Sequence, residues 1–389
     1  MIDKQTGLVR KIIELIMESP NKRITFYQFM NLALYEKKLG YYTKNKNKIG
    51  KADDFYTNSS VGPVFGKTIA NNFLELLPYT TDDLEYNILE IGGGNGQFAK
   101  DVLDELKVKK SKIYVNLTYY MLETSSFHQS IQSEKLKEHS GKVVWLDNIS
   151  VLSRPFKGII FSNELFDAFP VHKVKYHSGK LYEIYVTWDE KDSKFKEVIN
   201  VLSDIRLEEY FKKQNILLKE GQIAEVNLDA LTMLNSINEV LEKGYVLTID
   251  YGYLAFELYD RNRLGGTLIC YYEHTANDDC YQNIGDQDIT SHVNFSALID
   301  YGMELGLENI CFTYQSIFLL NNGILDYFKK LDTFDHQNTD FFNNKDLKTN
   351  RAIRQLITPG EMGETYKVLL QQKKINNSNY NFLKDIWNR

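Results

Sequence analysis

The sequence has few cysteines and no long apolar run. Its 389 residues include three cysteines, Cys270, Cys280 and Cys311, and they form no close CxxC pair. A disulfide framework and a zinc ribbon are therefore not supported, and three scattered thiols fit a reducing compartment. Apolar runs such as residues 157–161 fall far short of the roughly 20 residues that a membrane-spanning helix needs.

Basic residues are not in excess either. The chain has 52 acidic and 46 basic residues, for a net charge of −6. Such a chain is poorly suited to holding nucleic-acid phosphates, so we expect neither a nucleic acid nor a membrane as partner. Residues 1–19 have the pattern of an amphipathic helix that carries acids and lacks a small-residue cleavage site. This is not typical of a secretory signal or a transit peptide, and it predicts a cytoplasmic location.

Short apolar segments alternate with helical patterns in the middle of the chain. The segments 87–91, 119–123, 143–146 and 158–162 are predicted strands. The alternation predicts an α/β fold with a mostly parallel sheet covered by helices. We expect an N-terminal helical region (1–60), a first part of the core (61–170), an inserted cap subdomain (171–235) that begins with a hairpin, the remaining core with C-terminal strands (236–372) and a peripheral tail (373–389).

The most informative motif is a glycine-rich turn between a predicted strand and a predicted helix, Glu90-Ile-Gly-Gly-Gly-Asn-Gly96. Gly92, Gly94 and Gly96 let the backbone turn tightly and approach a ligand, and the following helix offers unpaired N–H groups. A dinucleotide site would need its third glycine at position 97, which is Gln97. The spacing favours S-adenosylmethionine (AdoMet), which has no pyrophosphate; a plain glycine-rich turn is the alternative.

Acidic residues follow the next predicted strands. Glu123 can accept hydrogen bonds from both ribose hydroxyls, and Asp147 from an adenine amino group. Asn163, Glu164 and Asp167 follow the fourth strand, where carboxylates beside a methyl donor can hold a cationic nitrogen and orient its lone pair. The alternatives are solvated strand-end acids and a helix N-cap cluster.

Further polar residues are expected on the substrate side, either in a pocket wall or in a flap. They are Tyr42, Asp54, Thr57, Asp250, His274, Asp288 and His292. For the earliest of them, a surface loop over a core helix is the alternative. The histidines and Asp288 do not have the spacing of a zinc site, so no metal is predicted.

Taken in order, these motifs resemble the MidA family of AdoMet-dependent methyltransferases, which is related to the mitochondrial complex I assembly-factor methyltransferase. The matching segments span most of the chain: 29–42, 54–57, 65–66, 90–96, 163–170, 250–252, 266–274 and 287–293. The chain departs from the family at Gly93 and Asn95, where the family usually has Pro and Arg. It also departs at positions 58–60, where Asn-Ser-Ser replaces Ser-Pro-Glu.

The resemblance implies a class I methyltransferase with a Rossmann-like, seven-stranded, mostly parallel sheet, N-terminal helices and an inserted cap. It implies AdoMet as cofactor, with Glu90 in the AdoMet loop, and a protein arginine as methyl acceptor. Three alternatives stay open: a nicotinamide-dependent oxidoreductase, a non-catalytic assembly or chaperone-like factor, and a small-molecule methyltransferase. The oligomeric state also stays open, with a homodimer as one option.

Overall fold

The chain forms two compact units, each assembled from three separate segments. The computed structural model describes residues 7–44, 58–109, 112–152, 155–273, 275–329, 345–377 and 379–383. Unit 1 comprises Met1–Lys48, Phe166–Met233 and Gly252–Tyr301, and unit 2 comprises Ile49–Leu165, Leu234–Tyr251 and Gly302–Arg389. Residues 252–301 thus belong with the N-terminal helices. The five-part division expected from the sequence follows chain order and stays a prediction.

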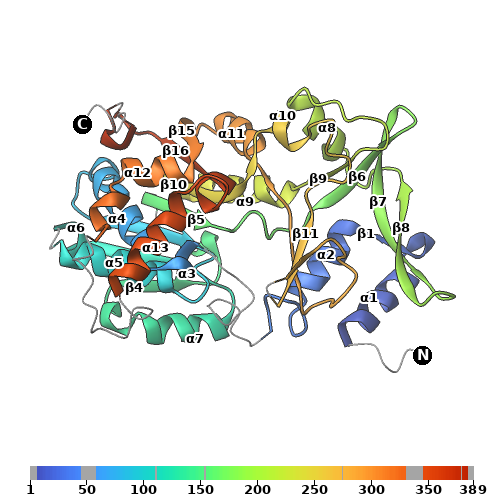
Figure 1. The fold of residues 1–389 in the computed structure, drawn as a ribbon, viewed down its shortest axis with the longest axis horizontal. Helices are drawn as coiled ribbons and strands as arrows, with labels where there is room; N and C mark the ends of the chain where they lie inside the picture. The colour runs from blue at the N-terminus through green and yellow to red at the C-terminus, as the bar shows by residue number, and fades with distance from the viewer. Residues whose placement is uncertain are drawn as a thin grey trace, which may run out of the picture. The chain divides into compact units, whose positions relative to one another are not determined.

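Unit 2 is built around a mostly parallel sheet of seven strands, in the order β15-β16-β10-β5-β2-β3-β4 (Figure 1). The strands are β2 (Tyr86–Ile91), β3 (Leu117–Leu122), β4 (Val143–Leu146), β5 (Phe156–Asn163), β10 (Leu241–Tyr253), β15 (Glu308–Tyr314) and β16 (Tyr366–Lys373). The strands from β4 to β10 pair in parallel, whereas β16 is antiparallel to both β10 and β15. The predicted α/β fold with a mostly parallel sheet is confirmed; beside these seven strands, an eighth strand, β14 (Val293–Asn294), pairs with β10.

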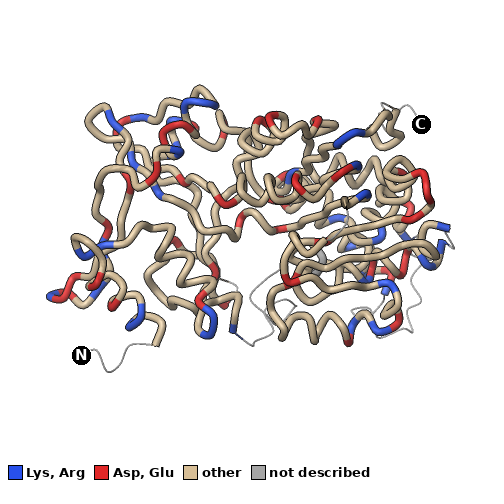
Figure 2. Tube along the Cα trace, turned by 180° about the vertical axis from the view of Figure 1, so that it is seen from behind, with Lys and Arg blue, Asp and Glu red and all other residues tan. Residues whose placement is uncertain are grey.

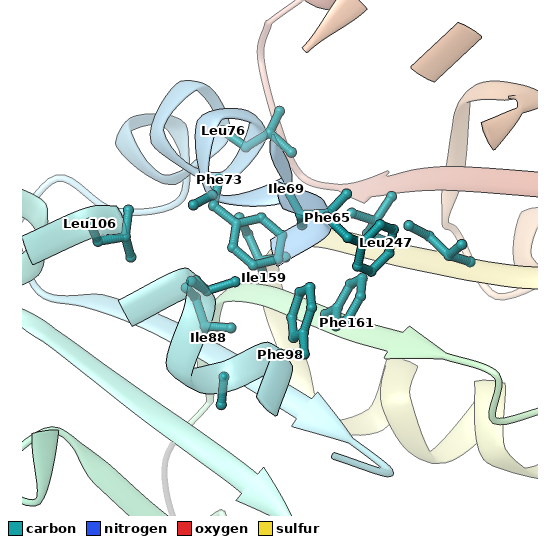
Figure 3. Packing of buried hydrophobic residues seen from close by; sticks show 14 of the residues in the cluster. Phe65, Ile69, Phe73, Leu76, Ile88, Phe98, Leu106, Ile159, Phe161 and Leu247 are labelled. Carbon is teal, nitrogen blue, oxygen red and sulfur yellow. The ribbon is translucent and has the colours of Figure 1, made fainter. Parts of the chain in front are cut away.

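The helices of unit 2 pack an aromatic core against this sheet. They are α3 (Asn58–Val61), α4 (Val64–Leu76), α5 (Gln97–Val108), α6 (Lys112–Val115), α7 (Ser126–Lys135), α12 (Gln315–Asn321), α13 (Lys345–Ile357) and α14 (Met362–Thr365). Phe65, Ile69 and Phe73 lie four residues apart on one face of α4 and point into the core (Figure 3). Phe98 of α5 stacks on Phe161 of β5, with ring centroids 4.3 Å apart. This contact holds α5, and the glycine-rich turn before it, against the sheet.

Unit 1 contains two antiparallel sheets and several helices. In the larger sheet the order is β1-β7-β6-β9, with β8 also paired to β7; in the smaller it is β12-β11-β13. The strands are β1 (Arg23–Thr25), β6 (His172–His177), β7 (Lys180–Asp189), β8 (Lys194–Asn200), β9 (Ile223–Val226), β11 (Ile269–Tyr272), β12 (Thr275–Asn277) and β13 (Asp288–Thr290). The helices are α1 (Gly7–Glu18), α2 (Phe26–Tyr35), α8 (Arg206–Lys213) and α10 (Ala255–Leu258). Helices α9 (Leu228–Val240) and α11 (Phe295–Glu304) contain residues of both units, and β14 (Val293–Asn294) pairs with Gly252 and Tyr253.

The predicted hairpin in unit 1 is present and joins β6 to β7. Its two turn residues, Ser178 and Gly179, have φ angles of 51° and 76°, which match the right-handed twist of the flanking strands. The sequence indicated only a charged stretch where β8 lies. Strand β8 forms because Phe195 packs its ring edge-on against Trp188 of β7, at 5.0 Å between centroids. The cross-strand contact outweighs the low strand propensity of the neighbouring lysines.

Basic and acidic residues are interspersed along both units. Figure 2 shows them alternating over short distances of the described chain. In that part of the chain, no helix combines the length and the apolar character that a bilayer-crossing segment requires. All three cysteines are free thiols.

Candidate functional site

The glycine-rich turn lies at the carboxyl end of β2, which is paired with β5 on one side and with β3 on the other. The N–H of Gly96 donates to the carbonyl of Gly93 at 2.8 Å, and the N–H of Gln97 donates to Oδ1 of Asn95 at 3.0 Å. Gly96 caps α5 with a φ of 77°, a conformation that a side chain at this position would strain. The turn therefore brings the backbone and the start of α5 to the edge where parallel sheets bind ligands.

Glu90 lies directly under this turn. It is 4% exposed, and a Cβ added at Gly93 would stand 3.1 Å from its carboxyl carbon and 2.6 Å from Cε of Met121. Burial raises the pKa of Glu90 to about 7; the hydrogen bond from Tyr119 opposes the shift, and the charge of Glu123 adds to it. The absence of a side chain at Gly93 thus keeps the turn closely packed on a buried acid.

Glu123 follows β3 and is held by its surroundings. Its Oε1 accepts from the N–H of Ser125 at 2.8 Å, and its Oε2 accepts from Nε2 of Gln132 at 3.3 Å. The same Gln132 nitrogen donates to the carbonyl of Gly94 at 2.8 Å. Burial raises the pKa of Glu123, and the bond from Ser125 opposes the shift. Gln132, which is fully buried, therefore ties the predicted ribose acid to the glycine-rich turn.

Asp147 lies beside Glu123 at the end of β4. Nε2 of Gln129 donates both to Oδ1 of Asp147, at 2.9 Å, and to the main-chain carbonyl of Glu123, at 2.6 Å. The structure thus brings together all six predicted cofactor residues at the carboxyl ends of β2, β3 and β4. Their individual roles stay predictions.

This edge of the sheet fits AdoMet. Gly92, Gly94 and Gly96 carry no side chain, so a ligand can approach the backbone of the turn closely. The space at Gly92 is limited, because a Cβ there would stand 3.2 Å from Cδ1 of Leu165. Two carboxylates, Glu90 and Glu123, lie close enough for the charge of one to raise the pKa of the other. Such an acidic site disfavours a pyrophosphate and favours a sulfonium and an ammonium.

A second polar group lies at the end of β5. Nδ2 of Asn163 donates to Oε1 of Glu164 at 2.9 Å, and the N–H of Asn58 donates to the same oxygen at 3.1 Å. Nδ2 of Asn58 donates to Oδ1 of Asn163 at 3.0 Å. Glu164 has a φ of 52°, which is strained for a side chain of its size, and its N–H is held by the carbonyl of Ile249 at 3.0 Å. The strain indicates that the surroundings fix the direction of Glu164.

Asp250 supports this arrangement from β10. Its side chain is fully buried, and its two oxygens accept from the N–H groups of Tyr251, at 2.9 Å, and Leu165, at 3.2 Å. Because one of these bonds holds the residue after Glu164, Asp250 anchors the backbone on which Glu164 is displayed. It was predicted as a substrate-binding residue, and that role stays a prediction.

A third group lies in unit 1. The hydroxyl of Tyr42 donates to Oδ1 of Asp288 at 2.8 Å, and the ring of Tyr42 stacks on Tyr35 with centroids 5.3 Å apart. The hydroxyl of Tyr35 donates to the carbonyl of Ala168 at 3.0 Å. Burial, followed by the charges of Asp288 and Asp167, raises the pKa of Tyr35 well above its usual range; for Tyr42, burial and Asp288 do the same. Two buried carboxylates and two stacked tyrosines thus form one cluster.

The remaining predicted residues are distributed as follows. Asp167 belongs to the cluster in unit 1, whereas Asn163 and Glu164 belong to unit 2. His292 lies in unit 1, with its N–H donating to Oγ1 of Thr267 at 3.1 Å and its ring 5.2 Å from that of Tyr253. Asp54, Thr57 and His274 lie outside the described residues. Within the ranges that the structure describes, no group of three or more potential ligands could hold a metal ion.

Sequence reasoning missed Asn58, Gln132 and Tyr35. Gln132 sits on a helix whose composition is that of a surface helix, and only its position opposite the glycine-rich turn makes it important. Asn58 appeared only as a departure from the family pattern. Tyr35 was one of several tyrosines in a segment, and its stacking with Tyr42 depends on the turn that follows α2.

Comparisons with known proteins agree with this geometry. A family model described as "Putative S-adenosyl-L-methionine-dependent methyltransferase" matches residues 68–313. The chain is 24% identical over 383 residues to the human protein arginine methyltransferase NDUFAF7, covering 92% of this chain and 82% of the human protein. It is 24% identical to the Drosophila melanogaster homologue over 307 residues, covering 73% of this chain and 68% of the fly protein.

A solved structure is similar over nearly the whole chain. It is that of a "likely methyl transferase" from Burkholderia thailandensis bound to S-adenosyl-homocysteine, with a TM-score of 0.86 and 28% identity. The match covers 97% of this chain and 95% of the other. The nicotinamide-dependent alternative is thereby set aside.

One expectation is overturned by these relatives. The predicted cytoplasmic location is wrong by this comparison, because the named relatives are all mitochondrial proteins. The cofactor and the enzyme class, by contrast, are confirmed. The fold, the glycine-rich turn and the family match together show that this chain belongs to the MidA-like family of AdoMet-dependent methyltransferases.

Proposed function

We propose that this enzyme methylates a guanidinium nitrogen of a protein arginine. Its curated relatives from human and fly are named protein arginine methyltransferases. The observation that carries the proposal is the cluster in unit 1 formed by Tyr35, Tyr42, Asp167 and Asp288. Asp167 is 5% exposed and Asp288 0% exposed. The negative charge of each carboxylate raises the pKa of both tyrosines.

The chemistry of this cluster suits an arginine side chain. A guanidinium is planar and always charged, it binds carboxylates through paired N–H donors, and it stacks on aromatic rings. The stacked rings of Tyr35 and Tyr42 offer such faces. A negatively charged, tyrosine-lined site would thus select a cation over a neutral small molecule.

The remaining residues have matching roles in this proposal. AdoMet, when bound, supplies a methyl group on a sulfonium. Glu123 accepts hydrogen bonds from its ribose, and Asp147 from its adenine. Asn163 and Glu164 hold negative charge at the edge of the unit 2 sheet where the methyl donor would bind. Bound AdoMet would give its methyl group to the acceptor nitrogen and leave as S-adenosylhomocysteine, and the proton lost by the guanidinium would be released to solvent. Because the displacement is in line, these residues act mainly by positioning.

The test is a methyl transfer with radiolabelled AdoMet into cell extract, followed by mass spectrometry of the labelled species. The proposal expects label in methylarginine of a protein. Label confined to the small-molecule fraction would support small-molecule methylation instead. If this chain binds AdoMet but transfers no label to any component of the extract, the result would support a non-catalytic assembly factor.

A further inference from the structure

Asn58 closes a hydrogen-bonded ring at the end of β5. It is the first residue of α3, and its side chain is 0% exposed. Its N–H and its Nδ2 donate to Glu164 and Asn163 respectively, and Asn163 donates to Glu164. The ring therefore joins three polar side chains that come from two distant parts of the sequence.

The ring fixes the direction of both amides. An ionised carboxylate only accepts hydrogen bonds, so the NH₂ group of Asn163 must face Glu164 and its Oδ1 must face Asn58. Asn58 must then present its NH₂ group to Asn163. This leaves Oδ1 of Asn58 pointing out of the ring, buried, and with no hydrogen-bond partner among the residues that the structure describes. A buried amide oxygen in this position calls for a donor.

The position of Asn58 indicates where such a donor comes from. Helix α3 packs against α5, the helix that begins at the glycine-rich turn (Figure 1). The turn also reaches the residue after Glu164, because a Cβ at Gly92 would stand 3.2 Å from Cδ1 of Leu165. In the strand order β5-β2-β3-β4, the end of β5 lies on one side of the turn, and Glu123 and Asp147 lie on the other.

We propose that Oδ1 of Asn58 accepts a hydrogen bond from the ammonium group of the amino-acid part of AdoMet. If Glu123 and Asp147 bind the nucleoside, as the proposed function requires, the amino-acid end of the cofactor extends toward β5. Its ammonium is a strong, charged donor. Asn58 is then a cofactor-binding residue, and its hydrogen bonds to Asn163 and Glu164 also position these two side chains relative to the bound cofactor.

The test measures binding by titration calorimetry with two ligands. S-adenosylhomocysteine carries the ammonium, whereas 5′-methylthioadenosine has the same nucleoside and lacks the amino acid. Replacing Asn58→Leu removes the acceptor at nearly constant volume. We expect the affinity for S-adenosylhomocysteine to fall roughly 10- to 100-fold, the scale of one hydrogen bond to a charged group. The affinity for 5′-methylthioadenosine should stay within about twofold of the wild type.

Asn72 provides the matched control. It is a fully buried asparagine on α4 of the same unit, and it lies outside the ring. Asn72→Leu should leave both affinities unchanged. Two results for Asn58→Leu would overturn the proposal. An equal loss of affinity for both ligands would indicate a merely structural role, and an unchanged affinity for both would show that Asn58 does not bind the cofactor.

A measurement on the wild-type protein covers the case in which Asn58→Leu fails to fold. S-adenosylhomocysteine is compared with its deaminated analogue, and equal affinities would refute a bound ammonium. Neither titration depends on methyl transfer. A failure to find methylarginine would therefore count against the proposed acceptor and leave this inference standing.

Discussion

Tyr119 of β3 donates its hydroxyl to Oε2 of Glu90 on the adjacent strand β2, at 2.9 Å, with both residues buried below the glycine-rich turn. The bond favours the charged form of Glu90, yet burial dominates and raises the pKa of Glu90 to about 7. Glu90, directly below the glycine-rich turn, is therefore expected to change its charge near neutral pH.

Glu90 should make the unliganded protein less stable as the pH rises. Its pKa is about 7 in the folded protein against a usual value of 4.5, so the folded state holds a proton that the unfolded state has released between these values. The loss starts near the unfolded pKa and is complete above the folded one. Glu90→Gln removes the charge and keeps an oxygen for Tyr119. We expect the variant to gain stability over wild type by roughly 1–3 kcal/mol between about pH 5 and pH 8.

Thermal unfolding of both proteins across this pH range checks the prediction. The two unfolding temperatures should separate as the pH rises and stop separating above about pH 7. Parallel profiles would show that Glu90 remains charged in the folded protein.

The parts of the fold that depend on local signals could be predicted. Strand β2, the turn and α5 follow one another within residues 86–108, and the glycines of the turn together with the apolar periodicity are enough to identify them. The acids at strand ends were located for the same reason: once the strands are placed, a parallel sheet brings their carboxyl ends to one edge.

The contacts that build the rest of the site could not be predicted in this way. Asn58 and Asn163 are 105 positions apart, and Tyr42 and Asp288 are 246 apart. Such pairs depend on how unit 1 and unit 2 are each assembled from three segments. The amino-acid composition does not change at residue 252, so the sequence gives no sign that Gly252–Tyr301 belongs to the same unit as the N-terminal helices.

Replacing Gly96→Ala should destabilise the protein and weaken cofactor binding. The residue has a φ of 77°, and a Cβ there would stand 3.2 Å from Cγ of Gln132, so an alanine is strained and displaces the side chain that bridges to Glu123. We expect a loss of about 1–2 kcal/mol in stability. Gly141→Ala is the control, because its Cβ would meet nothing within 4 Å. Unfolding temperatures of the two variants give the answer, and equal values would contradict the prediction.

Asp288→Asn should impair methyl transfer without affecting the cofactor. The amide oxygen still accepts from Tyr42, but the negative charge that the proposed guanidinium needs is lost. We expect kcat/KM for the protein acceptor to fall roughly 10- to 100-fold. The affinity for S-adenosylhomocysteine should be unchanged.

The neighbouring acid Asp286 serves as control for Asp288. It forms an ion pair with Lys44 at 2.6 Å, and its side chain is 42% exposed, so its charge is screened by solvent. Asp286→Asn should keep the wild-type rate. If the two variants lose activity alike, the effect comes from the net charge of unit 1 and the assignment of Asp288 fails.

Glu123→Ala should weaken AdoMet binding by about 1–3 kcal/mol, the scale of a lost charged hydrogen bond. Its carboxylate also holds the N–H of Ser125 and the amide of Gln132, so the variant tests both the ribose contact and the support of the turn. Glu123→Gln separates them, because the amide oxygen still accepts from Ser125 while the charge is gone. Glu134→Ala, at a fully exposed acid on α7 paired with Lys137, is the matched control. Titration calorimetry should rank the affinities as control, Glu123→Gln and Glu123→Ala. An unchanged affinity in Glu123→Ala would remove Glu123 from the cofactor site.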